Sequence, residues 1–225
     1  MRHARETSGT DTRERLLDVA ERLFAERGYS NVPTRTIAEA ASANTAAVHY
    51  HFGSKEKLLE VVFRRRLDPL NEERVALIQQ TVTGEGAPNI GDVLRAFVEP
   101  TLRKPKTEGE RLFRLLAGRA STDPNPEVRT ILFEAYDAVA RAFVGAVAEA
   151  CPHLSKQELF WRIACVYGAM LYIRADNGRL QAVFGKEFSL TDPEGAIRYA
   201  LPFMTAGMQA SPVDIDTSSD TNGKD

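Results

Sequence analysis

The residue types best suited to chemistry in this 225-residue chain lie in residues 40–55, AASANTAAVHYHFGSK. Small side chains come first, and His49, Tyr50, His51 and Phe52 follow within one turn of a helix. Two nearby histidines suggest a metal site or a catalytic base. A spacing of two residues, however, points the rings to different sides of a helix, and no Glu or Cys nearby completes a zinc pattern. We therefore expect neither a metal ligand set nor a catalytic residue here, and Phe52 is expected to anchor a core.

The small residues of this stretch suit a helix that enters the major groove of DNA, because such a helix must bring its backbone close to the base edges. Asn44 and Thr45 can hydrogen-bond to bases, while Ala46 and Ala47 leave room for the approach. The alternative is that these alanines pack a small three-helix core, as we expect Val48 to do.

Phosphate contacts are the second requirement of a DNA-binding surface. Tyr50, His51 and Lys55 can donate hydrogen bonds to phosphate oxygens, and Lys55 lies in the first turn of the next helix, where free backbone N–H groups attract anions. Thr34 and Arg35 begin the preceding helix and can reach the DNA backbone or a guanine.

Helical periodicity runs through the whole chain and strand signals are nearly absent, so the sequence predicts an all-α fold. Asp11 is expected to cap the first helix and Gly28 to end it, Thr34 to cap the second, Asn44 the third and Ser54 the fourth. The expected helices span residues 11–28, 36–41, 45–52, 54–83, 90–104, 108–121, 125–151, 155–175 and 192–209. Residues 176–190 are expected to be irregular, and Pro69 is expected to kink the long connector helix.

Charge and composition divide the chain. Residues 1–66 hold 12 Lys and Arg against 9 Asp and Glu, whereas residues 67–225 hold 17 against 22. A basic N-terminal segment on an acidic body is compatible with a nucleic-acid module joined to a different domain. No apolar run is long enough to span a membrane, the N-terminus lacks the apolar segment of a secretory signal, and Cys151 and Cys165 fit buried positions in a reducing compartment. We expect a cytoplasmic protein.

One pattern of apolar, small and polar positions runs through residues 12–62. Its positions are Leu16, Ala20, Leu23, Phe24, Gly28, Thr34, Ile37, Ala38, Ala41, His51, Phe52, Lys55, Leu58 and Leu59. This segment resembles the N-terminal domain of the TetR family of bacterial transcriptional regulators. Two departures occur: Ser42 stands where the family usually has Gly, so we expect this turn to avoid a left-handed backbone, and His49 stands where the family usually has Tyr.

The resemblance implies a homodimer that binds a double-stranded DNA operator and responds to a small-molecule effector, without a cofactor. It implies four parts: a flexible arm over residues 1–10, a helix-turn-helix DNA-binding domain over 11–54, a helical ligand-binding and dimerisation domain over 55–210 that begins with the connector helix 55–83, and a disordered tail over 211–225. The implied DNA contacts are Thr34, Arg35, Thr45, His49, Tyr50, His51 and Lys55, with Asn44, Ala46 and Ala47 against the bases.

The effector domain is similar, over LDPLNEERVALI and ELFWRIACVYGAML, to that of the PsrA-like regulators of fatty-acid metabolism. This similarity implies an elongated apolar effector such as a fatty acid or an acyl-CoA; a flat aromatic molecule is the alternative. The candidate effector contacts are Phe97, Phe113, Arg119, Phe133, Tyr136, Trp161, Tyr167, Met170 and Arg174. For each aromatic residue, ordinary core packing is the alternative.

The helix expected over residues 157–175 is apolar around nearly its whole circumference and must be covered on all sides. We expect it to pair with the last helix and with their symmetry mates as the four-helix interface of a two-fold dimer. The candidate interface residues are Phe160, Ala164, Leu171, Ala196, Ala200, Phe203, Met204 and Gly207.

Two classes of function remain open from the sequence. The first is a ligand-responsive DNA-binding regulator, a repressor or an activator. The second is an all-α small-molecule-binding protein or an enzyme whose N-terminal helices are structural. Salt-dependent binding to duplex DNA distinguishes the two classes.

Overall fold

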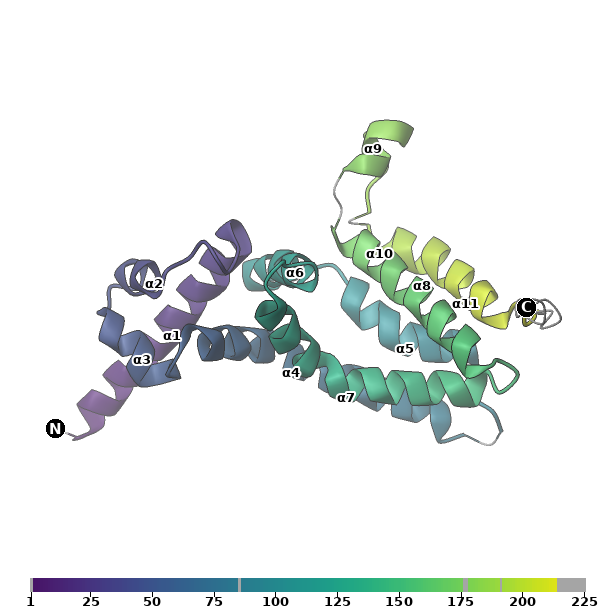
Figure 1. The fold of residues 1–225 in the computed structure, drawn as a ribbon, viewed down its shortest axis with the longest axis horizontal. Helices are drawn as coiled ribbons and strands as arrows, with labels where there is room; N and C mark the ends of the chain where they lie inside the picture. The colour runs from purple at the N-terminus through teal and green to yellow at the C-terminus, as the bar shows by residue number, and fades with distance from the viewer. Residues whose placement is uncertain (1, 85, 176–177, 191, 214–225) are drawn as a thin grey trace, which may run out of the picture.

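The computed structural model describes the backbone of residues 2–84, 86–175, 178–190 and 192–213. Every regular element within these ranges is a helix, which confirms the all-α prediction. Figure 1 shows the first three helices gathered at one end of an elongated molecule and most of the later helices stacked toward the other.

The N-terminal end consists of α1 (Arg2–Arg27), α2 (Thr34–Ala40) and α3 (Thr45–Phe52). Local signals set most of the boundaries. Gly28, at φ 80°, follows the last residue of α1. The Asn44 side chain accepts a hydrogen bond from the backbone N–H of Ala47 at 2.8 Å, and Ser54 accepts one from Lys57 at 3.2 Å. These predicted stops and caps are confirmed.

Three expectations about this end are wrong. Helix α1 begins at Arg2, so Asp11 lies inside the helix and is not its cap, and residues 2–10 belong to the same helix. Helix α2 is preceded by Pro33, whose fixed φ presets the entry, and Thr34 is its first residue and not its cap. Ser42 adopts φ 53°, the left-handed conformation that we expected the turn to avoid.

The remainder of the chain begins with α4 (Lys55–Val82), which continues through Pro69, and α5 (Ile90–Leu102). It continues with α6 (Glu108–Ser121), α7 (Pro126–Ala150) and α8 (Lys156–Ala175). The last segment comprises α10 (Pro193–Gly195), a π-helical turn (Ala196–Ala200) and α11 (Leu201–Gln209).

A short helix that the sequence did not predict, α9 (Arg179–Phe184), projects away from the stacked helices (Figure 1). It lies between Gly178 and Gly185, both at positive φ, which isolate its six residues. Residues 176–177 and 214–225 lie outside the described part of the chain, so only residues 211–213 of the expected disordered tail are described, and these are not helical.

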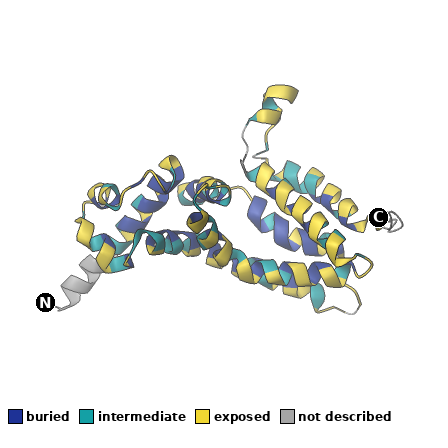
Figure 2. Ribbon diagram, in the orientation of Figure 1, coloured by how far each residue is buried: buried dark blue, intermediate teal, exposed yellow. Residues whose placement is uncertain are grey.

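Two buried clusters hold the helices together. Figure 2 shows buried residues on the inward sides of the N-terminal helices and of α4, α5 and α7, whereas the outer side of α8 is exposed. The first cluster combines α1–α3 and the first half of α4 with Leu112, Phe113 and Leu116 of α6 and Leu132 of α7. The second joins the rest of α4 to α5, α7, α8 and α11. The expected DNA-binding domain therefore shares its core with α6 and the start of α7.

Polar contacts strengthen this union between α1 and the body. The Arg66 guanidinium of α4 donates to both carboxylate oxygens of the buried Glu21 of α1, at 2.9 and 3.0 Å. Arg65 pairs with Asp18 at 2.7 Å. The expected boundary near residue 54 is therefore crossed by apolar packing and by ion pairs.

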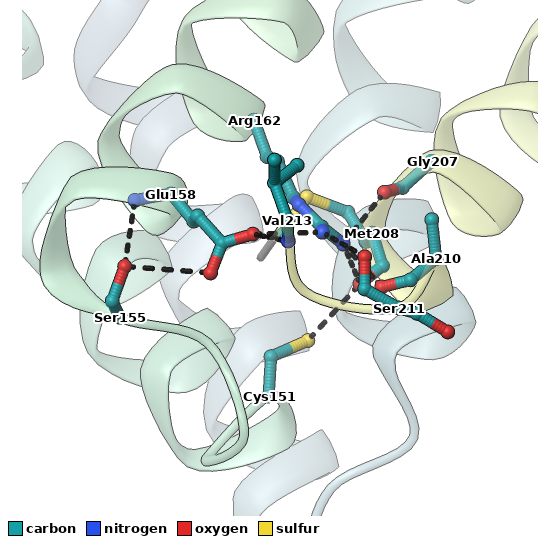
Figure 3. Close-up of polar contacts among 9 residues, drawn as sticks. All are labelled: Cys151, Ser155, Glu158, Arg162, Gly207, Met208, Ala210, Ser211 and Val213. Atoms are coloured by element: carbon teal, nitrogen blue, oxygen red, sulfur yellow. Dashed lines mark hydrogen bonds and ion pairs between the residues drawn. The ribbon is translucent and has the colours of Figure 1, made fainter. Parts of the chain in front are cut away.

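The end of α11 is attached to α8 by one arginine (Figure 3). Arg162 donates to the backbone carbonyls of Gly207, Met208, Ala210 and Ser211 at 2.7–3.1 Å. A cation at this position satisfies carbonyls left free at a helix C-terminus and complements the helix dipole. The outer face that α8 and α11 share is consequently held in one arrangement.

Candidate nucleic-acid interface and effector cavity

Helix α3 presents one buried and one exposed face. Val48 and Phe52 are buried in the first core cluster, which fixes the rotation of the helix. Thr45 and Ala46 consequently face outward and are exposed, and Tyr50 is 85% exposed. Asn44 and the half-buried Ala47 complete this short surface.

The end of α3 fixes the two histidines in different ways. His49 Nδ1 lies 3.0 Å from the carbonyl oxygen of Gly53, and because a carbonyl only accepts, this nitrogen is the donor. In the neutral ring Nε2 is then an acceptor. The half-buried His51 ring packs edge-on against Tyr50, with centroids 5.0 Å apart. Among the described residues, no group of three His, Cys, Asp or Glu side chains is placed to hold a metal ion.

Lys55 has an internal partner. Its ammonium donates to the Tyr29 carbonyl at 2.7 Å and lies 4.0 Å from the centre of the Tyr29 ring. Burial lowers the pKa of Lys55, and the Tyr29 hydroxyl donates to Glu56 at 2.8 Å. Lys55 therefore holds the start of α4 against the α1–α2 connection, and a phosphate contact would have to share its ammonium.

The start of α2 lies beside α3 and adds the two remaining expected contacts. Arg35 is exposed and pairs with Glu39 at 2.7 Å, and Thr34 is half-buried. Arg35 must therefore break its ion pair with Glu39 to reach DNA, and the free-energy cost is small because the pair is exposed to solvent.

A cavity of about 500 Å³ lies among α4, α5, α6, α7 and α8, within the usual size range of small-molecule sites. Most of its wall is apolar or aromatic. The structure brings together six of the expected effector contacts in this wall, and also Leu171, which the sequence assigned to the dimer interface. These six are Phe97, Phe133, Tyr136, Tyr167, Met170 and Arg174.

Three expected effector contacts lie outside this wall. Phe113 packs edge-on against Phe63, with ring centroids 6.4 Å apart, in the first core cluster. Arg119 donates to the Glu26 carbonyl at 2.8 Å and so binds α6 to the end of α1. Trp161 is 62% exposed on the outer side of α8. These three residues thus lie in the first core cluster, between α6 and α1, and on the outer side of α8. Residue type alone did not distinguish these places from the cavity.

Arg74 was missed in the sequence and is the most unusual residue of the cavity. It is 2% exposed, and its Nε donates to the Phe97 carbonyl at 3.1 Å. The guanidinium lies 3.8 Å from the centre of the Phe97 ring, and burial lowers the pKa of Arg74 to about 10. Its spacing from Leu67 and Ile78 places it on the buried stripe of α4, a signal that the sequence contained.

The expected dimer residues fall into three environments. Phe160 and Phe203 are 65% and 78% exposed, and Ala164 and Gly207 are also exposed on α8 and α11. Ala196 and Ala200 are half-buried. Met204 is an exception, because it is buried in the core of its own protomer. Large apolar side chains that face outward on α8 and α11 need a partner surface.

Comparison with known families places this architecture. The description "Bacterial regulatory proteins, tetR family" matches residues 16–62, and "Tetracyclin repressor-like, C-terminal domain" matches residues 95–207. The chain belongs to the TetR family of bacterial regulatory proteins. This family membership confirms the resemblance identified from the sequence; the more specific PsrA-like resemblance stays a prediction.

Curated relatives include the HTH-type transcriptional repressor KstR2 of Rhodococcus jostii, 43% identical over 68 residues, which are 30% of this chain and 33% of KstR2. The regulator BetI of Rhizobium meliloti is 28% identical over 120 residues, 53% of this chain and 56% of BetI. This chain thus spans about a third to a half of the length of these relatives.

Solved structures of the same fold include the fatty acid degradation regulator FadR of Bacillus halodurans, with a TM-score of 0.65 and 14% identity over 87% of this chain and 95% of that one. FadR of Bacillus subtilis in complex with stearoyl-CoA has a TM-score of 0.61 and 15% identity over 86% and 98%. Over the described part of the chain, no helix combines the length and apolar character needed to cross a membrane.

Proposed function

We propose that this chain is a cytoplasmic, dimeric DNA-binding transcriptional regulator, and not an enzyme, that a small apolar effector releases from a palindromic operator. The observation that supports DNA binding best is the outward face of α3. Its small residues leave the backbone accessible for a groove, and Tyr50 at its end is 85% exposed.

The proposed dimer uses the exposed sides of α8 and α11. Phe160 and Trp161 of α8 and Phe203 of α11 are each more than half exposed, and so is Tyr199 of the adjoining π-helical turn. Pairing this face with a second copy removes their apolar area from water and relates two α3 helices by a two-fold axis. Two such helices read half-sites about 34 Å apart or somewhat more.

The proposed effector occupies the apolar cavity, and a fatty acid or an acyl-CoA is favoured. Phe97, Phe133, Tyr167 and Met170 supply an apolar wall, and Arg74 and Arg174 supply positive charge beside it. The complex of FadR from Bacillus subtilis with stearoyl-CoA supports this choice, because a protein of the same fold binds such a molecule.

Helix α6 offers a physical connection between the cavity and the DNA-binding surface. Ala117 and Ser121 line the cavity, while Leu116 belongs to the core cluster that holds α1–α3, and Arg119 bonds to the end of α1. A ligand that shifts α6 therefore shifts α1 as well. A coupling free energy of about 1–3 kcal/mol would change operator affinity about 5–150-fold.

The test is selection of duplex DNA from a random pool by the purified protein, followed by affinity measurements over a range of salt concentrations. We expect a palindromic site whose affinity falls steeply with salt. Tyr50→Ala should weaken that binding, and Tyr50→Phe, which keeps the ring and removes only the hydroxyl donor, should weaken it as well because the phosphate contact needs that hydroxyl. If the folded protein enriches no sequence at low salt and without effector, the proposal is refuted and the small-molecule-binding alternative takes its place.

A further inference from the structure

A second cavity of about 280 Å³ lies beside the apolar one, between α4, the α5–α6 connection and α6. Six cationic side chains line this basic cavity against two carboxylates, Glu73 and Glu110. The cations are Arg66, Arg103, Lys104, Lys106, Arg114 and Arg174. Such an excess of one sign in a small hollow concentrates the electrostatic field and attracts anions.

Within the described ranges, two of these cations have carboxylate partners. Arg66 bonds to the buried Glu21, and Arg103 pairs with Glu73 at 2.6 Å. The other four, Lys104, Lys106, Arg114 and Arg174, make no ion pair with any described residue.

Arg174 carries an unpaired hydrogen-bond donor at this basic cavity. Its Nε atom is buried and has no hydrogen-bond partner in the part of the chain that the structure describes, and a buried donor left unpaired is costly. Burial lowers the pKa of the neighbouring Arg114, and the positive charge of Arg174 lowers it further. Two guanidinium groups that repel each other in a partly buried place are stabilised by an anion between them.

The two cavities adjoin each other. Thr101 and Arg174 line both of them, so Arg174 lies where the apolar wall meets the basic one. One molecule with an apolar chain and an anionic head can therefore occupy both cavities. A carboxylate carries a single charge and can satisfy Arg174, but it leaves Lys104 and Lys106 without a partner.

We propose that the effector is an acyl chain joined to a phosphate-bearing head group, and that the basic cavity binds the phosphates. This proposal rests on the proposed function and narrows its effector from fatty acid or acyl-CoA to the phosphorylated class. Arg174 contacts the junction of chain and head, Arg114 the nearest anionic oxygen, and Lys104 and Lys106 the outer phosphates. Acyl-CoA and lysophosphatidic acid share this chemistry.

The basic cavity also reaches the DNA-binding end of the molecule. Arg66 lines it and at the same time holds Glu21 of α1. A bound phosphate competes with Glu21 for the same guanidinium, so that head-group binding loosens the attachment of α1 to α4. The phosphorylated effector thus acts on the DNA-binding helices through a contact that a free fatty acid does not reach.

The experiment is isothermal titration calorimetry of the full chain with lauroyl-CoA, lauroyl lysophosphatidic acid, laurate and free CoA, all below their micellar concentrations. We expect a phosphorylated lauroyl compound to bind at least about tenfold more tightly than laurate, because its phosphates meet cations that laurate leaves unpaired. The tighter of the two phosphorylated compounds identifies the source of the head group. Equal affinity for laurate and both phosphorylated compounds would overturn the proposal.

The matched variants are Lys104→Ala/Lys106→Ala and the control Lys156→Ala/Lys186→Ala, whose lysines are exposed and line neither cavity. The first variant should lower the affinity for the phosphorylated ligand about five- to tenfold and leave the affinity for laurate unchanged. The control variant should leave both affinities unchanged. An unchanged affinity for the phosphorylated ligand in the first variant contradicts the assignment of these lysines.

If selection yields an operator but no phosphorylated ligand binds preferentially, only the effector inference fails. If such a ligand binds and no operator is found, the regulator function fails and the site stands.

Discussion

Glu21→Gln tests whether the buried ion pair between α1 and α4 supports the whole N-terminal end. The substitution keeps the shape of the side chain and removes its charge. The Glu21 side chain is 4% exposed and that of Arg66 is 25% exposed, and the pair makes two hydrogen bonds of 2.9 and 3.0 Å. The variant thus leaves a half-buried guanidinium facing a neutral amide.

The expected loss follows from this geometry. Removing one partner of a fully buried ion pair costs about 3–5 kcal/mol. Arg66 keeps some contact with water and can rehydrate, so we expect a loss of about 2–3 kcal/mol in the free energy of unfolding. For a chain of this length each kcal/mol lowers the melting temperature by about 2–4 °C, which gives a decrease of about 4–12 °C.

The assay is urea and thermal unfolding followed by far-UV circular dichroism, at one fixed protein concentration because a dimer is stabilised by mass action. The control is Glu39→Gln, which removes an exposed carboxylate from its pair with Arg35 and should leave the midpoint unchanged. If both variants unfold with the same midpoint as the wild type, the pair does not hold α1 against α4, and the proposed competition between phosphate and Glu21 loses its basis.

Three further predictions concern single positions. Ser42→Gly should raise the free energy of unfolding by about 0.5–1 kcal/mol, because glycine adopts φ 53° without strain; Ser42→Ala keeps the strain, and a gain as large in that variant would contradict the argument. The pKa of Glu56 is lowered by hydrogen bonds from its own backbone N–H, from Ser54 and from Tyr29. Its carboxylate therefore stabilises the fold above pH about 4.5, and this contribution is lost as the pH falls through the lower folded-state pKa. Glu56→Gln removes the carboxylate, so the free energy of unfolding of this variant should fall less steeply on acidification than that of the wild type. Identical pH profiles of the two proteins would refute this. Arg162→Met should lower the free energy of unfolding by about 2–3 kcal/mol and weaken dimerisation, since the carbonyls at the end of α11 lose their donor; unfolding midpoints and sedimentation velocity measure both, and an unchanged dimer would show that α11 keeps its place without the arginine.

The helix boundaries that the sequence predicted correctly are those set by neighbouring residues. Asn44, Ser54 and Gly28 act within one turn, so their types suffice to place the start of α3, the start of α4 and the end of α1. Ser42 shows the limit of this reasoning, because packing of α2 against α3 imposes a left-handed backbone on a residue that does not favour it. The six residues of α9 were too few to show a helical period.

The candidate sites required contacts between residues far apart in the chain. The aromatic positions of α5, α7 and α8 were predicted as a group, and the structure places Phe97, Tyr136 and Tyr167 around one cavity. Arg119 has the same residue type as Arg174, yet it bonds to α1 and not to the cavity. The packing of the whole chain decides which face of α6 contacts α1. No local sequence pattern predicts that face.

The shared core of α1–α3, α6 and the start of α7 has a consequence for attempts to divide this protein or to recombine it with relatives. A fragment that ends near residue 54 would expose the apolar side chains that Leu112, Phe113 and Leu116 cover, so we expect limited proteolysis to release no stable N-terminal piece. In a chimaera that joins the first 54 residues to the body of another protein, α1 packs against a helix whose side chains do not match it. To transfer the DNA specificity intact, the junction of a chimaera must lie after residue 135, so that α6 is transferred together with the DNA-binding helices.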